Sequence, residues 1–153
     1  MVDFKSQKLD LLLACNEYVK HRLQTAKQAI ASARDAANND AKSSAGDKYE
    51  TTREMMNQEI SRNEQLLSIA IHMQQILNRI DEKKTTATIQ IGSVVETNNG
   101  SFFIAISIGE LVVHGQNYFV ISPESPIGEN LIGKTVNEHF IFNGKNYQIK
   151  SVH

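Results

Sequence analysis

Apolar side chains in the first part of the chain repeat with the period of a helix that packs along a partner helix. Between residues 9 and 37 they follow one another at alternating intervals of three and four. That spacing is the heptad period, which keeps one stripe of a helix facing its neighbour. The predicted stripe consists of Leu9, Leu12, Asn16, Val19, Leu23, Ala26, Ile30, Ala33 and Ala37.

The same period returns after a polar interruption at residues 38–47, which are rich in turn-forming Asn, Asp, Ser and Gly. The second stripe consists of Leu66, Ile69, Met73, Ile76 and Ile80, widened by Leu67, Ala70 and Leu77. Two stripes joined by a polar connection predict an antiparallel helical hairpin. We expect its first helix to begin near Asp3 or Ser6 and its second helix at Asp47, because these residue types cap helix N-termini.

Two residues of the first predicted helix, Asn16 and Cys15, each allow more than one interpretation. Asn16 lies in the stripe, where it either selects the register of the pair or is solvated. Cys15 is the one cysteine of the chain and has no second cysteine to pair with. We expect it to be a small buried or half-buried residue in a reducing compartment.

Beyond residue 82 the pattern changes to short stretches of β-branched and aromatic residues. Residues 1–82 contain one glycine and no proline, whereas residues 83–153 contain seven glycines and both prolines. A shift of this kind marks the boundary between a helical module and a β module. The predicted fold class is α+β, with an antiparallel coiled-coil hairpin at residues 1–84 and a small β domain at residues 85–153.

Turn signals divide the β domain into short strands and one helix. Asn98-Asn99-Gly100 and Asn143-Gly144 predict tight hairpins. Residues 127–132 are expected to form a brief helix that Gly133 closes. The predicted strands are residues 93–96, 101–107, 111–113, 118–121, 139–142 and 147–150.

Composition narrows the function classes. The net charge is −1, which gives little non-specific attraction to nucleic acid or to an anionic membrane. No apolar run approaches the roughly 20 residues that cross a bilayer, and the first residues lack the pattern of a secretory signal. The five histidines show no metal-ligand spacing, and no catalytic triad motif is present. We expect a cytoplasmic protein that is not an enzyme.

One stretch of the β domain resembles a known family. Residues 122–134 read SPESPIGENLIGK, which is similar to the "SP", short helix and "LIGK" signature of the bacterial transcript cleavage factors GreA and GreB. A closing hairpin with Tyr147-Gln148-Ile149 follows, as in that family. Ile91-Gly92-Ser93-Val94-Val95 resembles the family's first strand of this domain. The similarity covers residues 91–152, and the helical hairpin matches in architecture.

The resemblance implies a transcription elongation factor that binds RNA polymerase. Its FKBP-like β domain would bind at the rim of the secondary channel and its hairpin would enter the channel. The residues implied in polymerase docking are Ser125, Pro126, Gly133 and Lys134. No cofactor of its own is implied, and Mg²⁺ would be held jointly with RNA polymerase. Contact with DNA or RNA would be indirect, no membrane is involved, and a monomer is favoured over a dimer.

The hairpin tip departs from the family pattern. Family members carry two acids before a tyrosine, and alignment on Tyr49 places Lys42 and Ala45 at those positions. Asp40 and Asp47 remain as candidate acids for directing Mg²⁺, since carboxylates suit this cation. Regulation of elongation is therefore favoured over cleavage stimulation. The alternative is a non-catalytic coiled-coil protein that self-associates.

Overall fold

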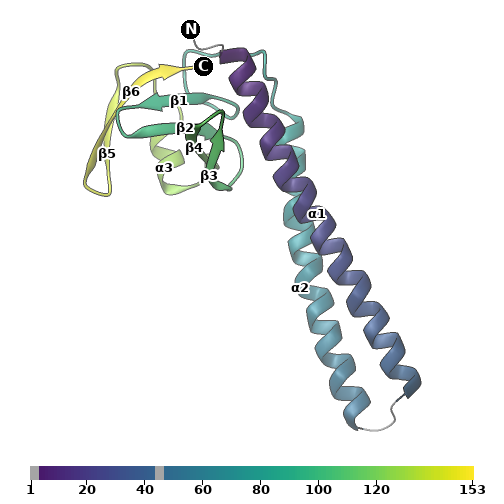
Figure 1. Cartoon of the computed structure of the whole chain (residues 1–153). Coiled ribbons are helices and arrows are strands. Elements are labelled where there is room, and N and C mark those ends of the chain that lie inside the picture. Colours follow the sequence, from purple (N-terminus) through teal and green to yellow (C-terminus); the bar gives the residue numbers. More distant parts are fainter. Residues whose placement is uncertain (1–3, 44–46) are drawn as a thin grey trace. The chain divides into compact units, whose positions relative to one another are not determined.

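The computed structural model describes the main chain of residues 4–43 and 47–153 and the side chains of residues 6–39 and 50–153. Two long helices come first, and a six-stranded mixed sheet with one short helix follows (Figure 1). The α+β class predicted from the sequence is confirmed. The helices are α1 (Phe4–Ser43), α2 (Asp47–Asn78) and α3 (Pro126–Leu131). The strands are β1 (Val94–Thr97), β2 (Gly100–Ile104), β3 (Gly109–Val113), β4 (Gln116–Ile121), β5 (His139–Phe142) and β6 (Lys145–Val152).

Most of the stripe predicted for α1 is buried. Small residues alternate with larger ones along it, which allows close approach of α2 at the alanines but buries little apolar area there. The buried members are Leu12, Val19, Ala26, Ile30 and Ala33. Asn16 is partly buried, and its Nδ2 donates to the carbonyl oxygen of Leu12 within the same helix at 2.9 Å.

The first turns of α1 differ from the prediction. Leu9 is exposed, whereas Leu11 and Cys15 are fully buried beside Leu12. This end of α1 also lies beside the β3–β4 hairpin, because Ser6, Gln7 and Asp10 line one hollow together with residues of that hairpin. Asp10 marks that contact, since its carboxylate lies 2.5 Å from Nε2 of His114. The prediction that Cys15 is buried is confirmed.

The stripe predicted for α2 is wrong at its start, although Ala70 and Leu77, which were also assigned to it, are buried. Leu66 is 45% exposed and Ile69 is 52% exposed, although both were assigned to the interface between the helices. The buried positions are Asn63, Ala70 and Leu77, which lie seven residues apart. Asn63 is polar and Ala70 is small, so these two buried positions add little to an apolar repeat. The larger residues Leu66 and Ile69, on a neighbouring face of the helix, therefore dominated the apolar repeat in the sequence.

The sheet has the order β3-β4-β2-β1-β6-β5. All neighbouring strands are antiparallel except β2 and β4, which pair in parallel around the β3 connection. The six predicted strands are all present. β2 ends at Ile104 rather than at residue 107, and β4 begins at Gln116 because only His114 and Gly115 form the preceding turn. Both turn residues have positive φ, 52° and 75°, as a type I′ hairpin turn requires.

Buried residues lie on both faces of the central strands β1 and β2. One face carries the core cluster of the β domain, into which Leu131 of α3 packs. The cluster consists of Ile89, Val95, Phe102, Ile104, Leu131, Phe140, Tyr147 and Ile149. The opposite face is formed by residues that the strand register places together, namely Val94, Phe103, Tyr118 and Val120.

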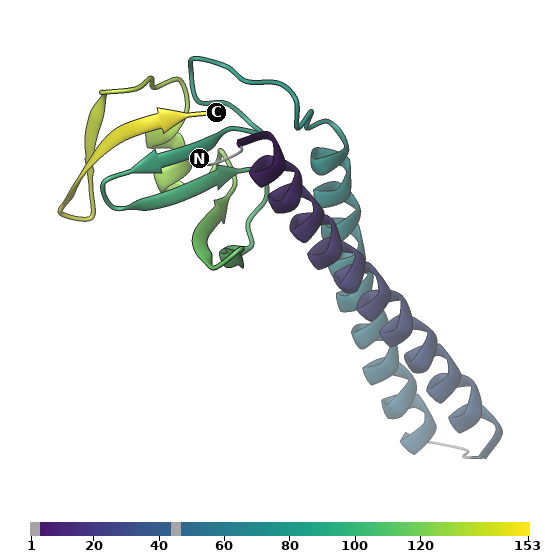
Figure 2. The ribbon, with the colours of Figure 1, turned by 45° about the horizontal axis from the view of Figure 1, so that its top comes forward.

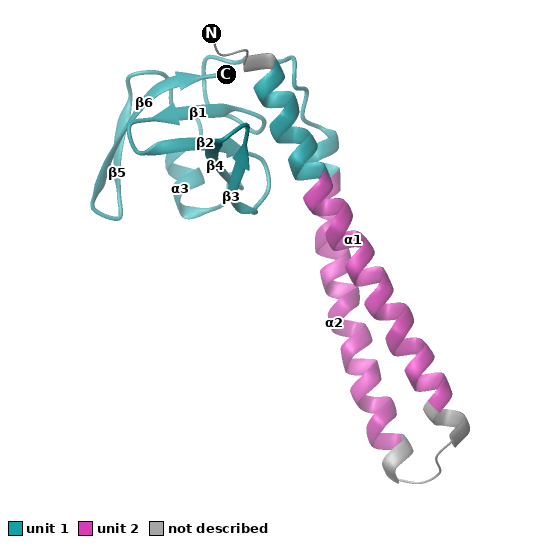
Figure 3. Cartoon of the chain, in the orientation of Figure 1, with its two compact units in different colours: residues 1–16, 75–153 teal, residues 17–74 magenta. Residues whose placement is uncertain are grey.

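The chain forms two compact units (Figure 3). Unit 1 contains residues 1–16 and 75–153, and unit 2 contains residues 17–74. Within unit 2, α1 and α2 lie side by side in both orientations (Figure 1, Figure 2). The start of α1 and the end of α2 therefore belong to the unit that holds the sheet.

Candidate functional site

The predicted site residues fall into two groups. The side chains of Asp40 and Asp47, the candidate acids of the hairpin tip, lie outside the described residues. Ser125, Pro126, Gly133 and Lys134 are described, and all four flank or begin the short helix α3. We call residues 122–136 the α3 segment.

Ser125 is the N-cap of α3. Its hydroxyl donates to the carbonyl oxygen of Ser122 at 2.7 Å and accepts the N–H of Gly128 at 3.1 Å. Pro126 follows at the start of the helix, where the absence of an N–H costs nothing because that donor has no partner within a helix. The Ser-Pro pair therefore fixes how the chain enters α3.

Gly128 fills the tightest position of the α3 segment. A Cβ atom at this residue would lie 2.2 Å from the carbonyl oxygen of Ser122 and 2.7 Å from Oγ of Ser125. Real Cβ atoms essentially never approach closer than 3.0 Å. The first half of the segment is therefore a close-packed turn that requires glycine.

The second half of the α3 segment is tied to the chain before β1. Gly133 has a φ of 83°, and its N–H donates to the carbonyl oxygen of Ile89 at 2.9 Å. The N–H of Ile89 donates in return to the carbonyl oxygen of Lys134 at 2.9 Å. Nζ of Lys134 lies 5.8 Å from the centre of the Phe140 ring, within the range of a cation–π contact.

The α3 segment presents several residues to solvent. Pro126 and Gly133 are exposed, and Lys134 is half-buried. Ile132 and Val136, which sequence reasoning did not assign to the site, are also exposed. The sequence places them on either side of Gly133, and Ile132 directly follows Leu131, which is buried. This position near a turn was the one sequence feature that could have indicated their exposure. The α3 segment therefore exposes two aliphatic side chains close in sequence to Lys134.

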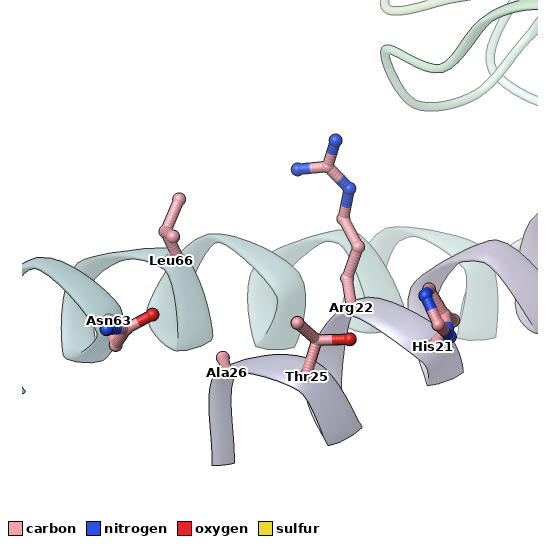
Figure 4. A pocket seen from close by; sticks show the side chains of 6 residues that line it. All are labelled: His21, Arg22, Thr25, Ala26, Asn63 and Leu66. Carbon is pink, nitrogen blue, oxygen red and sulfur yellow. The ribbon is translucent and has the colours of Figure 1, made fainter. Parts of the chain in front are cut away.

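A shallow groove runs between α1 and α2 in unit 2 (Figure 4). Its volume is about 220 Å³, and the small side chain of Ala26 leaves part of this space. Arg22 of α1 and Leu66 of α2 project on the same side of the groove (Figure 4). Asn63 is buried in its wall, where Nδ2 donates to the carbonyl oxygen of Glu59 at 2.9 Å.

One polar contact between the helices of unit 2 is a weak ion pair. Arg34 and Glu64 form an ion pair of 3.5 Å with both side chains exposed, and exposed pairs contribute only about 0–1 kcal/mol. Burial of the apolar stripe also contributes to the pairing of the two helices. Leu66 and Ile69 remain on the outer surface of α2, an apolar patch that the predicted register had placed inside the pair.

No three His, Cys, Asp or Glu side chains described in the structure gather where they could hold a metal ion. Of the helices within the described ranges, none combines the length and apolar character needed to cross a membrane. No family model matches the sequence, and no curated protein gives a significant match.

Proposed function

We propose that the protein is a transcription elongation factor similar to GreA and GreB. In this proposal the β domain binds RNA polymerase in the cytoplasm, and the helical hairpin enters the secondary channel and regulates elongation. The protein is not an enzyme, and any Mg²⁺ would be held jointly with the polymerase. Contact with DNA or RNA is indirect, and the factor acts as a monomer.

The α3 segment is the observation that carries the proposal. Its sequence resembles the Gre signature over 13 consecutive residues, 122–134. The contacts of Ser125 and Gly128 give a physical reason for the spacing of that signature, because each residue fits only its own position in the turn. A pre-ordered turn loses little conformational entropy when it binds a partner.

The helical pair supports the second half of the proposal. α2 has 32 residues and is about 48 Å long at a rise of about 1.5 Å per residue. Two such helices side by side form a slender element that suits a narrow channel. The buried residues of the two helices lie on the faces that pack together. The outer faces of the helices are therefore free to contact the walls of the channel.

Competition for core RNA polymerase tests the proposal. The protein should bind core polymerase, and authentic GreA should displace it. Lys134→Glu should weaken this binding at least tenfold, because it reverses the charge at the one basic residue of the α3 segment. Lys145→Glu is the matched control, since Lys145 is exposed and lies outside the segment. Circular dichroism should show that both variants remain folded.

Three outcomes would contradict the proposal. Binding that GreA does not compete for would remove the channel assignment. Equal losses for Lys134→Glu and Lys145→Glu would show that general charge, not the α3 segment, drives the association. Absence of any binding to core polymerase would remove the proposal as a whole.

Cleavage stimulation is a separate question. Lys42 and Ala45 stand where the Gre tip carries its acids, so we expect no strong stimulation of transcript cleavage in backtracked complexes supplied with Mg²⁺. If cleavage does occur, the double variant Asp40→Ala with Asp47→Ala should abolish it. Unchanged cleavage by this variant would exclude both residues.

Self-association is the second candidate function. The exposed Leu66 and Ile69 on α2 favour it, because exposed apolar patches often mark protein–protein contacts. Sedimentation at increasing concentration distinguishes the two candidates. A stable dimer that Leu66→Gln with Ile69→Gln converts to a monomer would support self-association and would contradict a monomeric factor.

A further inference from the structure

A small polar cavity lies in unit 1, away from the α3 segment. It is bounded by the start of α1, by the residues that directly follow α2 and by the chain that leads into β1, and its volume is about 90 Å³. Roughly 10–15 Å³ is enough to hold one water molecule. The cavity can therefore accept a small polyatomic group.

The residues that line the cavity carry an excess of positive charge. Lys8, Arg79 and Lys84 are basic, and Asp81 is the one acidic residue among the lining residues. Three positive charges against one negative charge leave an excess of two. One carboxylate oxygen of Asp81 already accepts the N–H of Lys83 at 2.9 Å, so that carboxylate also serves the local turn.

Lys8 is the unusual member of this set. Its side chain is only 4% exposed, whereas lysines are almost never fully buried unless they are paired. Its Nζ donates to the carbonyl oxygen of Lys84 at 2.7 Å and to a main-chain oxygen of His153 at 3.3 Å. An ammonium group has three donors, so one N–H is not used by the described residues.

The environment of Lys8 favours an added anion. The carbonyl oxygen of Lys84 carries only a partial charge and by itself compensates a buried cation incompletely. Burial lowers the pKa of Lys8, and the negative charge of Asp81 opposes that effect. An anion beside Nζ would raise this pKa again and would stabilise the charged form.

A hydroxyl group adds a neutral donor. Ser93 lines the same cavity and is buried. Its Oγ accepts the N–H of Gln90 at 3.0 Å, which leaves the hydroxyl proton able to donate. The cavity therefore combines a buried ammonium, a hydroxyl donor and the two more exposed basic residues Arg79 and Lys84.

We propose that this cavity binds a phosphate group, as inorganic phosphate or as the phosphate of a small nucleotide. Its charge excess matches the charge of about −1.5 to −2 that a phosphate monoester carries at pH 7. A tetrahedral oxyanion offers several acceptor oxygens to the ammonium, hydroxyl and guanidinium donors, and Arg79 can bind two of them at once. The volume suits one phosphate group, so the nucleoside part of a nucleotide would lie outside the cavity.

Titration of the full-length protein with inorganic phosphate tests the proposal. Ionic strength is held constant with chloride, and amide chemical shifts are followed by NMR. Saturable shifts at Gly92 and Ser93 are expected, because both residues line the cavity. A second titration compares adenosine 5′-monophosphate with adenosine: tighter binding of the nucleotide than of phosphate would identify a nucleotide as the favoured source.

Charge-matched variants separate this site from general attraction. Arg79→Gln with Lys84→Gln should weaken phosphate binding at least tenfold. Lys83→Gln with Lys145→Gln removes the same charge from exposed lysines that do not line the cavity, and it should leave binding unchanged. Lys8→Met should abolish saturable binding in a protein whose β-domain spectrum is otherwise preserved.

Several results would overturn the proposal. Shifts that grow linearly with phosphate, equal weakening by the two double variants, or equal binding of adenosine and its monophosphate would each exclude a phosphate site. The phosphate titration contains no polymerase, so its failure would leave the proposed elongation function intact. Failure of the polymerase competition would likewise leave the proposed phosphate site intact.

Discussion

Replacement of Gly128 by alanine tests whether the α3 segment is as tightly constrained as its geometry indicates. The added Cβ would lie 2.2 Å from the Ser122 carbonyl oxygen, which is main chain and cannot rotate away. Relief of the contact requires the turn to open, which breaks the Ser125 cap. Loss of a cap costs about 1 kcal/mol, and overpacking costs about 1–3 kcal/mol more. The expected loss in the free energy of unfolding is about 2–4 kcal/mol.

Urea denaturation followed by circular dichroism measures this loss, with Gly133→Ala as the control in the same segment. Gly133 has a φ of 83° and no atom within 4 Å of the position of an added Cβ, so alanine there meets backbone strain but no clash. That strain costs about 1–2 kcal/mol. Gly128→Ala should therefore be the more destabilising of the two substitutions.

The double variant Gly128→Ala with Ser125→Ala identifies the atom responsible. Removing Oγ of Ser125 relieves the contact of 2.7 Å but leaves the shorter contact with the Ser122 carbonyl oxygen. The double variant should remain as unstable as Gly128→Ala alone. A free energy of unfolding for Gly128→Ala within about 0.5 kcal/mol of the wild type, the range of ordinary surface substitutions, would refute the reasoning.

Three further predictions concern the helical pair and its base. Leu77→Ala, at a position that is 2% exposed, should lower the free energy of unfolding by about 2–5 kcal/mol in urea denaturation. Leu66→Ala should lower it far less. Equal losses would show that Leu66 lies in the interface between the helices, as the sequence pattern predicted. Asn63→Leu should raise the thermal midpoint of the helical signal, because a buried polar stripe residue reduces stability; a lower midpoint would contradict this. Burial raises the pKa of the Cys15 thiol to about 12, so a thiol reagent should react with it at pH 8 only after unfolding. Because the unfolded thiol loses its proton first, stability should fall as the pH rises from about 9 to 12, and Cys15→Ala should remove that contribution.

The strands of the β domain were predictable because their signals are local. Alternating apolar residues define each strand, and Asn143-Gly144 fixes a two-residue turn in which both residues have positive φ, 50° and 76°. The parallel pairing of β2 with β4 was not predictable in this way. It joins strands separated by β3, and no local pattern encodes which non-neighbouring strands meet.

The stripe of α1 was predicted better than that of α2 for a physical reason. The buried positions of α1 are mostly apolar, whereas Asn63 and Ala70 occupy the interface of α2. Polar and small residues weaken the periodic signal, so the exposed Leu66 and Ile69 dominated it. Leu11 is also fully buried, although it lies outside the predicted stripe of α1.

The candidate site shows a similar limit. Ser125, Pro126 and Gly133 were recognisable as a motif, but their contacts in this segment are those of caps and turns. Ile132 and Val136 were missed because exposure of an aliphatic residue depends on the tertiary fold. The cavity around Lys8 could not be found from sequence, since its lining residues come from positions 8 and 79–93.

The division of the chain into two units has an evolutionary consequence. Residues 17–74 fold against one another along a seven-residue repeat, while the sheet, its helical cover and both ends of the hairpin belong to the other unit. Insertion or deletion of one whole heptad in each helix would preserve both the repeat and the sheet-bearing unit. Hairpin length can therefore drift in steps of about 10 Å without rebuilding the domain to which it is joined.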